Sequence, residues 1–207
     1  MKEKAKLVNF ITFLLFIAFT FSGCSKDENS KEKTKKSYTL QPRELAVLDN
    51  LIKDETSVFL DGGESLIFKD NLLAVTATDV AKEYEKNQVS ADQKYFKQSL
   101  LVTGSISSIN SGLGNEPYVV LRGINEFLSP QIHFNKNNVA KIAELKKGQK
   151  LSFVCNGAGA IIGTPMFNNC SFADDYAAIK VAEIRTKIQK FLSGESRKQG
   201  VRSCNNV

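Results

Sequence analysis

The feature that most constrains the fold is a change of hydrophobic period near the middle of the chain. From residue 99 to residue 109 the side chains alternate between two faces, and Leu100, Val102 and Ile106 fall on one of them. This period of two predicts a long strand with one buried face. Gly104 lies inside it, and an internal glycine is typical of a bend or bulge where a sheet curls into a barrel.

Four more strands and one helix are expected downstream. A short helix at 138–146, ending before Gly148, separates the third strand from the fourth. Five strands with a helix between the third and the fourth are the plan of an OB-fold barrel, although other small barrels share most of it. The expected fold class is mainly β with flanking helices (α+β). The four strands are expected at Tyr118–Arg122, Gln131–Phe134, Lys150–Cys155 and Thr164–Phe172.

Helices are expected on both sides of this barrel domain, which spans 76–172. Thr78–Gln88 fits a helix capped by Thr78 or Asp79, with a connector at 91–96. A second, amphipathic helix is expected within 173–194 and packs on the barrel; a membrane-surface or partner-binding role is the alternative. Its apolar stripe consists of Ala177, Val181, Ile184, Ile188, Phe191 and Leu192.

The segment before the barrel, 38–75, is expected to be an extension with a short helix and a hairpin. Pro42–Lys53 has the apolar spacing of an amphipathic helix. Thr56–Ala74 reads as extended, with a turn at Asp61-Gly62-Gly63. The polar residues 195–207 are expected to form a disordered tail.

The N-terminus has the organisation of an export signal. Three lysines precede an apolar run of about 15 residues, which is short for a membrane-spanning helix. Residues 1–23 are therefore expected to be a signal peptide. The run ends in Phe21-Ser22-Gly23-Cys24, which resembles a bacterial lipobox with Phe in place of the usual Leu. A plain signal peptide or an uncleaved anchor is the alternative.

Lipidation of Cys24, for example with palmitate, would tie the protein to a membrane. Residues 24–37 then form a flexible tether, because 25–37 contain no apolar residue. Ser25 resembles the sorting pattern for the outer membrane, facing the periplasm; in a host without an outer membrane the site is the cell membrane. The expected localisation is the cell envelope.

The barrel region resembles a known family. The matching residues include Asp79-Val80-Ala81, Leu101-Val102-Thr103-Gly104, Tyr118-Val119-Val120-Leu121 and Cys155-Asn156-Gly157, together with Asn169-Cys170. Their order and spacing resemble the tRNA_anti-like OB-fold domain of bacterial exported proteins and lipoproteins. The resemblance covers 78–172 and implies an OB-fold, whereas a fold by itself does not fix a function.

The resemblance also bears on the cysteines, because Cys155 and Cys170 stand where the family often has two. With a turn centred near Ile162-Gly163, the two residues lie opposite each other on consecutive strands, so we expect a disulfide between them. Two buried thiols, or a pair with Cys204, are the alternatives.

The candidate ligand face follows from how OB-folds bind single strands, with aromatic residues of strands two and three in a basic groove. Tyr118, Arg122, His133 and Phe134 lie in those strands. His133 is the single histidine, and no cysteines have zinc-like spacing, so we expect no metal, no cofactor and no enzyme activity. The favoured hypothesis is a non-catalytic module for a protein or other envelope ligand. The alternative is an oligonucleotide or oligosaccharide, with nucleic acid the less favoured.

Overall fold

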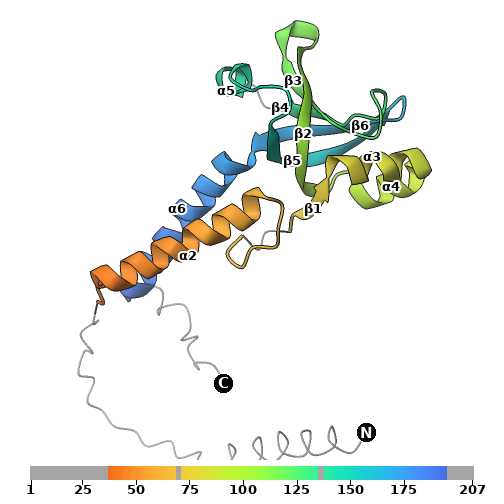
Figure 1. Cartoon of the computed structure of the whole chain (residues 1–207). Helices are drawn as coiled ribbons and strands as arrows, with labels where there is room; N and C mark the ends of the chain where they lie inside the picture. Colours follow the sequence, from red (N-terminus) through yellow and green to blue (C-terminus); the bar gives the residue numbers. More distant parts are fainter. Residues whose placement is uncertain (1–36, 69–70, 135–137, 195–207) are drawn as a thin grey trace, which may run out of the picture. The chain divides into compact units, whose positions relative to one another are not determined.

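The computed structural model describes residues 37–68, 71–134 and 138–194, and its centre is a closed five-stranded barrel (Figure 1). The strands pair in the order β2-β3-β4-β6-β5, and β5 pairs with β2 to close the ring. Only the β4–β6 pair is parallel within this ring. The barrel strands are β2 (Ser99–Ser111), β3 (Pro117–Leu121), β4 (Gln131–Phe134), β5 (Lys150–Ile161) and β6 (Thr164–Phe172).

This arrangement confirms the expected fold class. The short helix α5 (Val139–Ala143) lies between β4 and β5, as the OB-fold plan requires. All five barrel strands begin within one residue of their expected starts, whereas β5 runs six residues beyond the expected end at Cys155. The fold is therefore an OB-fold barrel with additional elements at both ends.

The long strand β2 changes partner along its length, which is how the sheet closes. Residues 99–105 pair with β5, and residues 106–111 pair with β3. The register shift lies between Ile106 and Ser108, just after Gly104. A Cβ at Gly104 would lie 2.9 Å from the Cβ of Ala77, so this glycine also lets a helix approach the barrel.

The barrel interior is filled by apolar side chains from every strand and contains the disulfide. Cys155 and Cys170 are bonded, with a Cα–Cα distance of 4.1 Å, and both are buried. The β5–β6 register has the expected centre, because Ile161 pairs with Thr164 across the turn. Cys204 lies outside the described residues. The largest fully buried side chains are Tyr95, Leu100, Ile106, Leu121, Ile132, Ile142, Phe153 and Phe167.

A sixth strand and two helices precede the barrel. The strand β1 (Leu73–Thr76) pairs in parallel with β2. The helix α3 (Ala77–Lys86) starts at Thr76, whose hydroxyl accepts the Asp79 N–H at 3.1 Å, so the cap is neither Thr78 nor Asp79. The expected connector at 91–96 lies mostly in a second helix, α4 (Gln88–Tyr95).

The expected hairpin within 56–74 is not present among the described residues. Instead, α2 (Pro42–Leu60) continues through Val58-Phe59-Leu60. Phe59 follows Ile52 by seven residues, so both lie on one helix face, and both are buried. Burial of Phe59 therefore extends the helix to the turn at Asp61-Gly62, and the extended segment forms only at β1.

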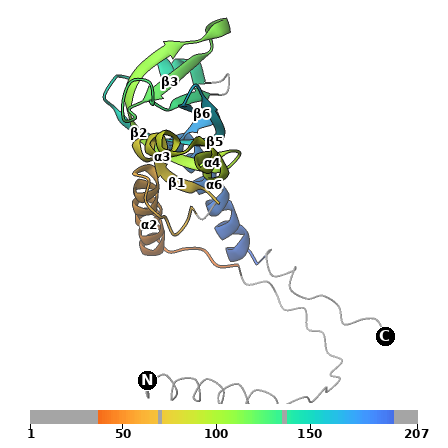
Figure 2. The same cartoon turned by 90° about the vertical axis from the view of Figure 1, so that its right-hand side faces the viewer.

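The helices α2 and α6 (Ala173–Leu192) lie side by side in both views and together form what we call the arm (Figures 1 and 2). Arg185 of α6 pairs with Asp49 of α2 at 2.7 Å. At the barrel end, Phe59 packs with Phe68, Leu101 and Ala177. The first turns of α6 thus pack on the barrel as expected, and the remainder packs on α2.

A buried hydrogen-bond chain fixes the end of α2 to the barrel. The Ser152 hydroxyl donates to the Leu60 carbonyl at 2.5 Å and lies 2.7 Å from the Thr103 hydroxyl.

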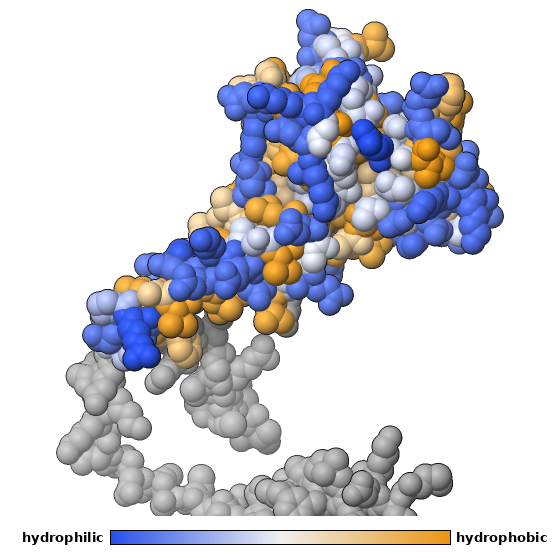
Figure 3. Space-filling view, in the orientation of Figure 1, coloured by the Kyte–Doolittle hydropathy of each residue, from blue (hydrophilic) through white to orange (hydrophobic). Residues whose placement is uncertain are grey.

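Farther along the arm, apolar side chains are exposed along one side of it (Figure 3). No helix within the described ranges is long and apolar enough to cross a membrane.

Candidate ligand-binding groove

A groove of about 480 Å³ lies on the outer face of the barrel, over β2, β3 and β4. Its floor follows from strand alternation: Val119 and Leu121 are buried inside, so Tyr118 and Val120 face outward. The β3–β4 loop and the β5–β6 turn form its sides. The lining residues are Ser107, Ser108, Asn110, Tyr118, Val120, Glu126, Phe127, Ser129, Gln131, Ile161, Ile162 and Thr164.

An aromatic pair lies on the same outer face. Tyr118 of β3 is the Cα partner of His133 of β4, and their rings stack with centroids 5.1 Å apart and planes 12° from parallel. The His133 Nε2 lies 3.3 Å from the Gln131 Oε1. Burial lowers the pKa of His133 below its usual 6.5, and the nearby Glu116 carboxylate partly opposes this shift. The pair is therefore an uncharged, flat surface near neutral pH.

Exposed apolar side chains form the rim of the groove: Phe127 from the β3–β4 loop, and Ile161 and Ile162 from the β5–β6 turn. Their exposed fractions are 74%, 61% and 99%. The loop and the turn are joined, because the Thr164 hydroxyl donates to the Phe127 carbonyl at 2.7 Å. The Asn125 side chain accepts the backbone N–H of Phe127 at 2.9 Å and so orders the loop. The apolar rim is therefore held in place by hydrogen bonds.

The turn itself has a disfavoured backbone. Ile162 has a φ of 50° and Gly163 has a φ of 80°, so both central residues are left-handed. Glycine adopts this region freely, whereas for a β-branched residue it is an outlier. Ile162 thus combines an unfavourable backbone conformation with a fully exposed apolar side chain. Neither feature stabilises the folded protein in the absence of a ligand.

The groove is poor in charge. Glu126 is the one charged residue among those that line it, and neither lysine nor arginine is among them. The floor carries hydroxyl and amide groups from Ser108, Asn110 and Gln131. These groups can donate and accept hydrogen bonds to an uncharged ligand.

The four residues expected at the ligand face do not all meet there. Tyr118 lines the groove, and His133 stacks on Tyr118 beside the groove without lining it. Arg122 is exposed just beyond β3; its N–H donates to the Ser105 carbonyl at 2.7 Å, and it does not line the groove. Phe134 points inward, 5.2 Å from the Phe172 ring centroid, because it follows the buried Ile132 by two residues.

The sequence reasoning missed the rim. Phe127 belongs to a loop whose position depends on the distant β5–β6 turn, which no local pattern specifies. Ile162 did carry a signal: the expected turn at Ile162-Gly163 has isoleucine where a two-residue hairpin turn normally has asparagine, aspartate or glycine.

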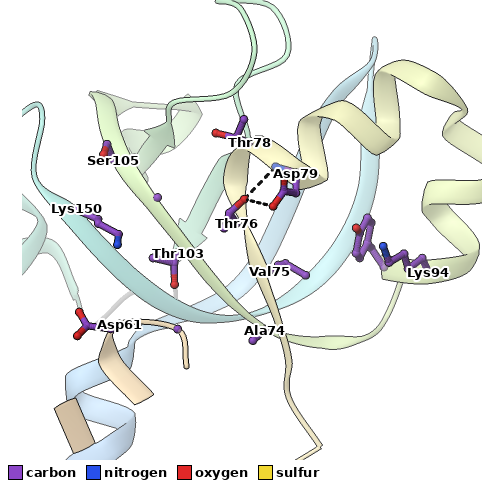
Figure 4. Close-up of a pocket in the computed structure, with 13 residues that line it drawn as sticks. Asp61, Ala74, Val75, Thr76, Thr78, Asp79, Lys94, Thr103, Ser105 and Lys150 are labelled. Carbon is purple, nitrogen blue, oxygen red and sulfur yellow. Dashed lines mark hydrogen bonds between the residues drawn. The ribbon is translucent and has the colours of Figure 1, made fainter. Parts of the chain in front are cut away.

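A second hollow, of about 540 Å³, lies where the end of α2, β1 and the start of α3 meet β2 (Figure 4). Lys94 and Lys150 line it together with Asp61 and Asp79. The Thr76 hydroxyl donates to the Asp79 carboxylate at 2.7 Å, and this bond lowers the pKa of Asp79. The contact between Thr76 and Asp79 belongs to the N-terminal cap of α3.

No group of three or more metal-ligating side chains is found in the part of the chain that the structure describes.

Comparison with known proteins places the chain in a family. The tRNA_anti-like family model matches residues 1–171. The chain belongs to the tRNA_anti-like family. Among solved structures, it is similar to a Klebsiella pneumoniae lipoprotein described as a candidate nucleic acid-binding protein, with 20% identity and a TM-score of 0.39. The match covers 47% of this chain and 90% of the Klebsiella protein. None of the curated proteins compared with the chain matches it.

Proposed function

We propose that this tRNA_anti-like protein is an exported, lipid-anchored binding module whose groove takes an apolar segment of a protein partner in the cell envelope. The observation that carries the proposal is the rim of Phe127, Ile161 and Ile162. Exposed, ordered apolar side chains beside a groove are typical of the centre of a protein interface. The disfavoured backbone at Ile162 supports the same conclusion, because such outliers concentrate at functional sites.

An oligosaccharide is the second candidate, and the stacked Tyr118–His133 pair favours it. Sugars offer apolar faces to aromatic rings and hydroxyl groups to amides, and the floor supplies both kinds of partner. Single-stranded nucleic acid is less favoured, because its phosphates need the cations that the lining residues lack.

Binding without catalysis is part of the proposal. Within the described residues, the His133 ring nitrogen meets Gln131, and no serine or cysteine is hydrogen-bonded to it. Covalent catalysis pairs a base with a nucleophile within hydrogen-bond reach, and His133 has no such partner among the described residues. The groove is therefore proposed as a recognition surface.

The anchor is proposed from the sequence. Phe21-Ser22-Gly23-Cys24 follows the apolar run, so Cys24 is the proposed site of lipid attachment, and the outer membrane is its proposed location. Cells grown with an alkyne analogue of palmitate should label the wild-type chain. The Cys24→Ser variant should lose both the label and membrane fractionation; a labelled variant would refute the site.

Site-specific photocrosslinking in intact cells tests the groove. A photoreactive phenylalanine at Phe127 or Ile162 should capture one envelope protein, whereas the same residue at Val89, exposed on α4, should not. Ile162→Asn should abolish capture from position 127. Capture that is equal at all three positions, or that survives Ile162→Asn, contradicts the proposal. Binding of soluble oligosaccharides that Tyr118→Ala removes would support the second candidate instead.

A further inference from the structure

The arm has a defined end opposite the barrel, where the start of the described chain meets the end of α6. The backbone N–H of Tyr38 donates to the Leu192 carbonyl at 2.9 Å. The exposed cationic and aromatic side chains near this contact are Tyr38, Arg43, Lys187, Lys190 and Phe191, which we call the arm base; the exposed Glu44 carboxylate accepts the Tyr38 hydroxyl beside them. The arm base thus lies where the described chain begins and where α6 ends.

The arm base combines positive charge with exposed aromatic rings. Tyr38 is 49% exposed and Phe191 is 60% exposed. Within the described ranges, Lys187 and Lys190 make no ion pair. Cations and aromatic rings that share one surface are characteristic of helices that rest on membranes.

The nearby acidic groups of α2 and α6 have partners of their own. Glu44 accepts the Tyr38 hydroxyl and the Gln41 N–H, and these bonds lower its pKa. Asp49 pairs with Arg185. Glu183 lies 3.7 Å from Lys180. Glu44 has no cationic partner among the described residues and stays ionised, so Arg43, Lys187 and Lys190 stand against one carboxylate. The arm base with Glu44 therefore keeps a net charge of about +2 that an external anion can meet.

We propose that the arm base rests on an anionic lipid surface, the membrane to which Cys24 is anchored. This inference depends on the anchor proposed above. Residues 25–36 span roughly 40 Å at most, so the lipid holds the arm base within reach of the bilayer. The arm, with α2 roughly 28 Å long, then holds the barrel and its groove away from the surface.

Tryptophan fluorescence can test this contact directly, because the chain contains no tryptophan. The Phe191→Trp variant has a single fluorophore in the arm base, and the Phe127→Trp variant has one at the groove rim; both positions are exposed. The lipidated full chain is bound to vesicles of phosphatidylcholine and phosphatidylglycerol that contain brominated lipid. The Phe191→Trp variant should lose about half of its fluorescence to bromine, and the Phe127→Trp variant should lose almost none.

A charge variant separates surface contact from tethering. Adding Lys187→Glu and Lys190→Glu to the Phe191→Trp variant should reduce its quenching, whereas adding Lys82→Glu and Lys86→Glu, on α3, should leave it unchanged. Vesicle-bound protein in which the arm-base fluorophore is quenched as weakly as the rim fluorophore would overturn the proposal while the anchor stands. Protein that does not float with the vesicles would overturn the anchor, and this inference with it.

Discussion

Ile162 occupies a turn position that ordinarily takes asparagine, aspartate or glycine. Its φ of 50° brings the side chain against its own backbone, and its 99% exposure means that no burial offsets the cost. The substitution Ile162→Asn should therefore raise the free energy of unfolding by about 1 kcal/mol. Urea unfolding of both proteins with the disulfide intact measures the change.

A matched control lies at the next residue. Gly163→Ala puts a Cβ on a backbone with a φ of 80° and should lower the unfolding free energy. If Ile162→Asn instead lowers the urea midpoint of unfolding, the backbone at Ile162 is not strained. The backbone argument for a ligand site at this turn then fails. If stability rises while crosslinking is lost, isoleucine is retained for binding.

His133 is a second residue whose state the fold controls. Burial lowers its pKa below 6.5, so the folded protein binds a proton less readily than the unfolded chain. Stability that depends on neutral His133 should be present at neutral pH and be lost as the pH falls from about 6.5 through the folded pKa. Because the chain has one histidine, an NMR titration of its Cε1 proton reports the pKa alone.

The variant His133→Phe isolates this contribution. It keeps a ring against Tyr118 but cannot titrate. The loss of unfolding free energy between about pH 7.5 and about pH 5 should be smaller in the variant than in the wild type. The carboxylates titrate in both proteins and cancel in the comparison. An equal pH dependence would show that the protonation of His133 is not coupled to folding.

At the scale of elements, the barrel was predictable because each strand carries its own signal. Alternation, turn residues and a short helix predict five strands and their positions along the chain, although other small barrels share most of this pattern. The β5–β6 register followed from one turn at Ile162-Gly163. Elements outside the barrel were harder, because α4 has only Ala91 and Tyr95 buried and β1 is four residues long. The end of α2 depends on where Phe59 is buried, which is a tertiary contact.

The candidate site was predictable only in part, for a related reason. Tyr118 and His133 share a strand pair, so topology alone brings them together. Phe134 follows His133 directly on β4, so its side chain lies on the opposite face of the strand and packs in the core. The rim requires two loops to meet through the bond from Thr164 to Phe127, and no pattern within either loop specifies that contact.

The disulfide joins consecutive strands and constrains a short loop. Cys155 and Cys170 are 15 residues apart, so the bond should stabilise the fold by about 3 kcal/mol through the unfolded state. The double variant Cys155→Ala with Cys170→Ala should unfold at correspondingly lower urea concentration. Cys204→Ala should leave stability and the non-reducing peptide map unchanged; a 155–204 link in the map of the exported wild-type chain would contradict the pairing.

At the scale of the whole molecule, charge and ligand surface are separated. The chain has a net charge of +6, but the residues that line the groove include no cation. The cations of the arm base lie at the far end of α2 and α6. The protein can therefore attract polyanions without recognising them, because the cations lie on the arm base and the groove lies on the barrel.

Binding to single-stranded DNA should therefore be weak and independent of the groove. In a fluorescence titration at low salt, where phosphate contacts are strongest, Tyr118→Ala should not change the residual affinity. Glu126→Arg should raise it, and the salt dependence of binding should become steeper by about 0.7 in log–log slope for each phosphate newly contacted. If the wild type binds tightly and Tyr118→Ala abolishes binding, bases stack in the groove despite its lack of cations. The absence of positive charge would then not decide the ligand class, and nucleic acid would replace the protein segment as the preferred ligand.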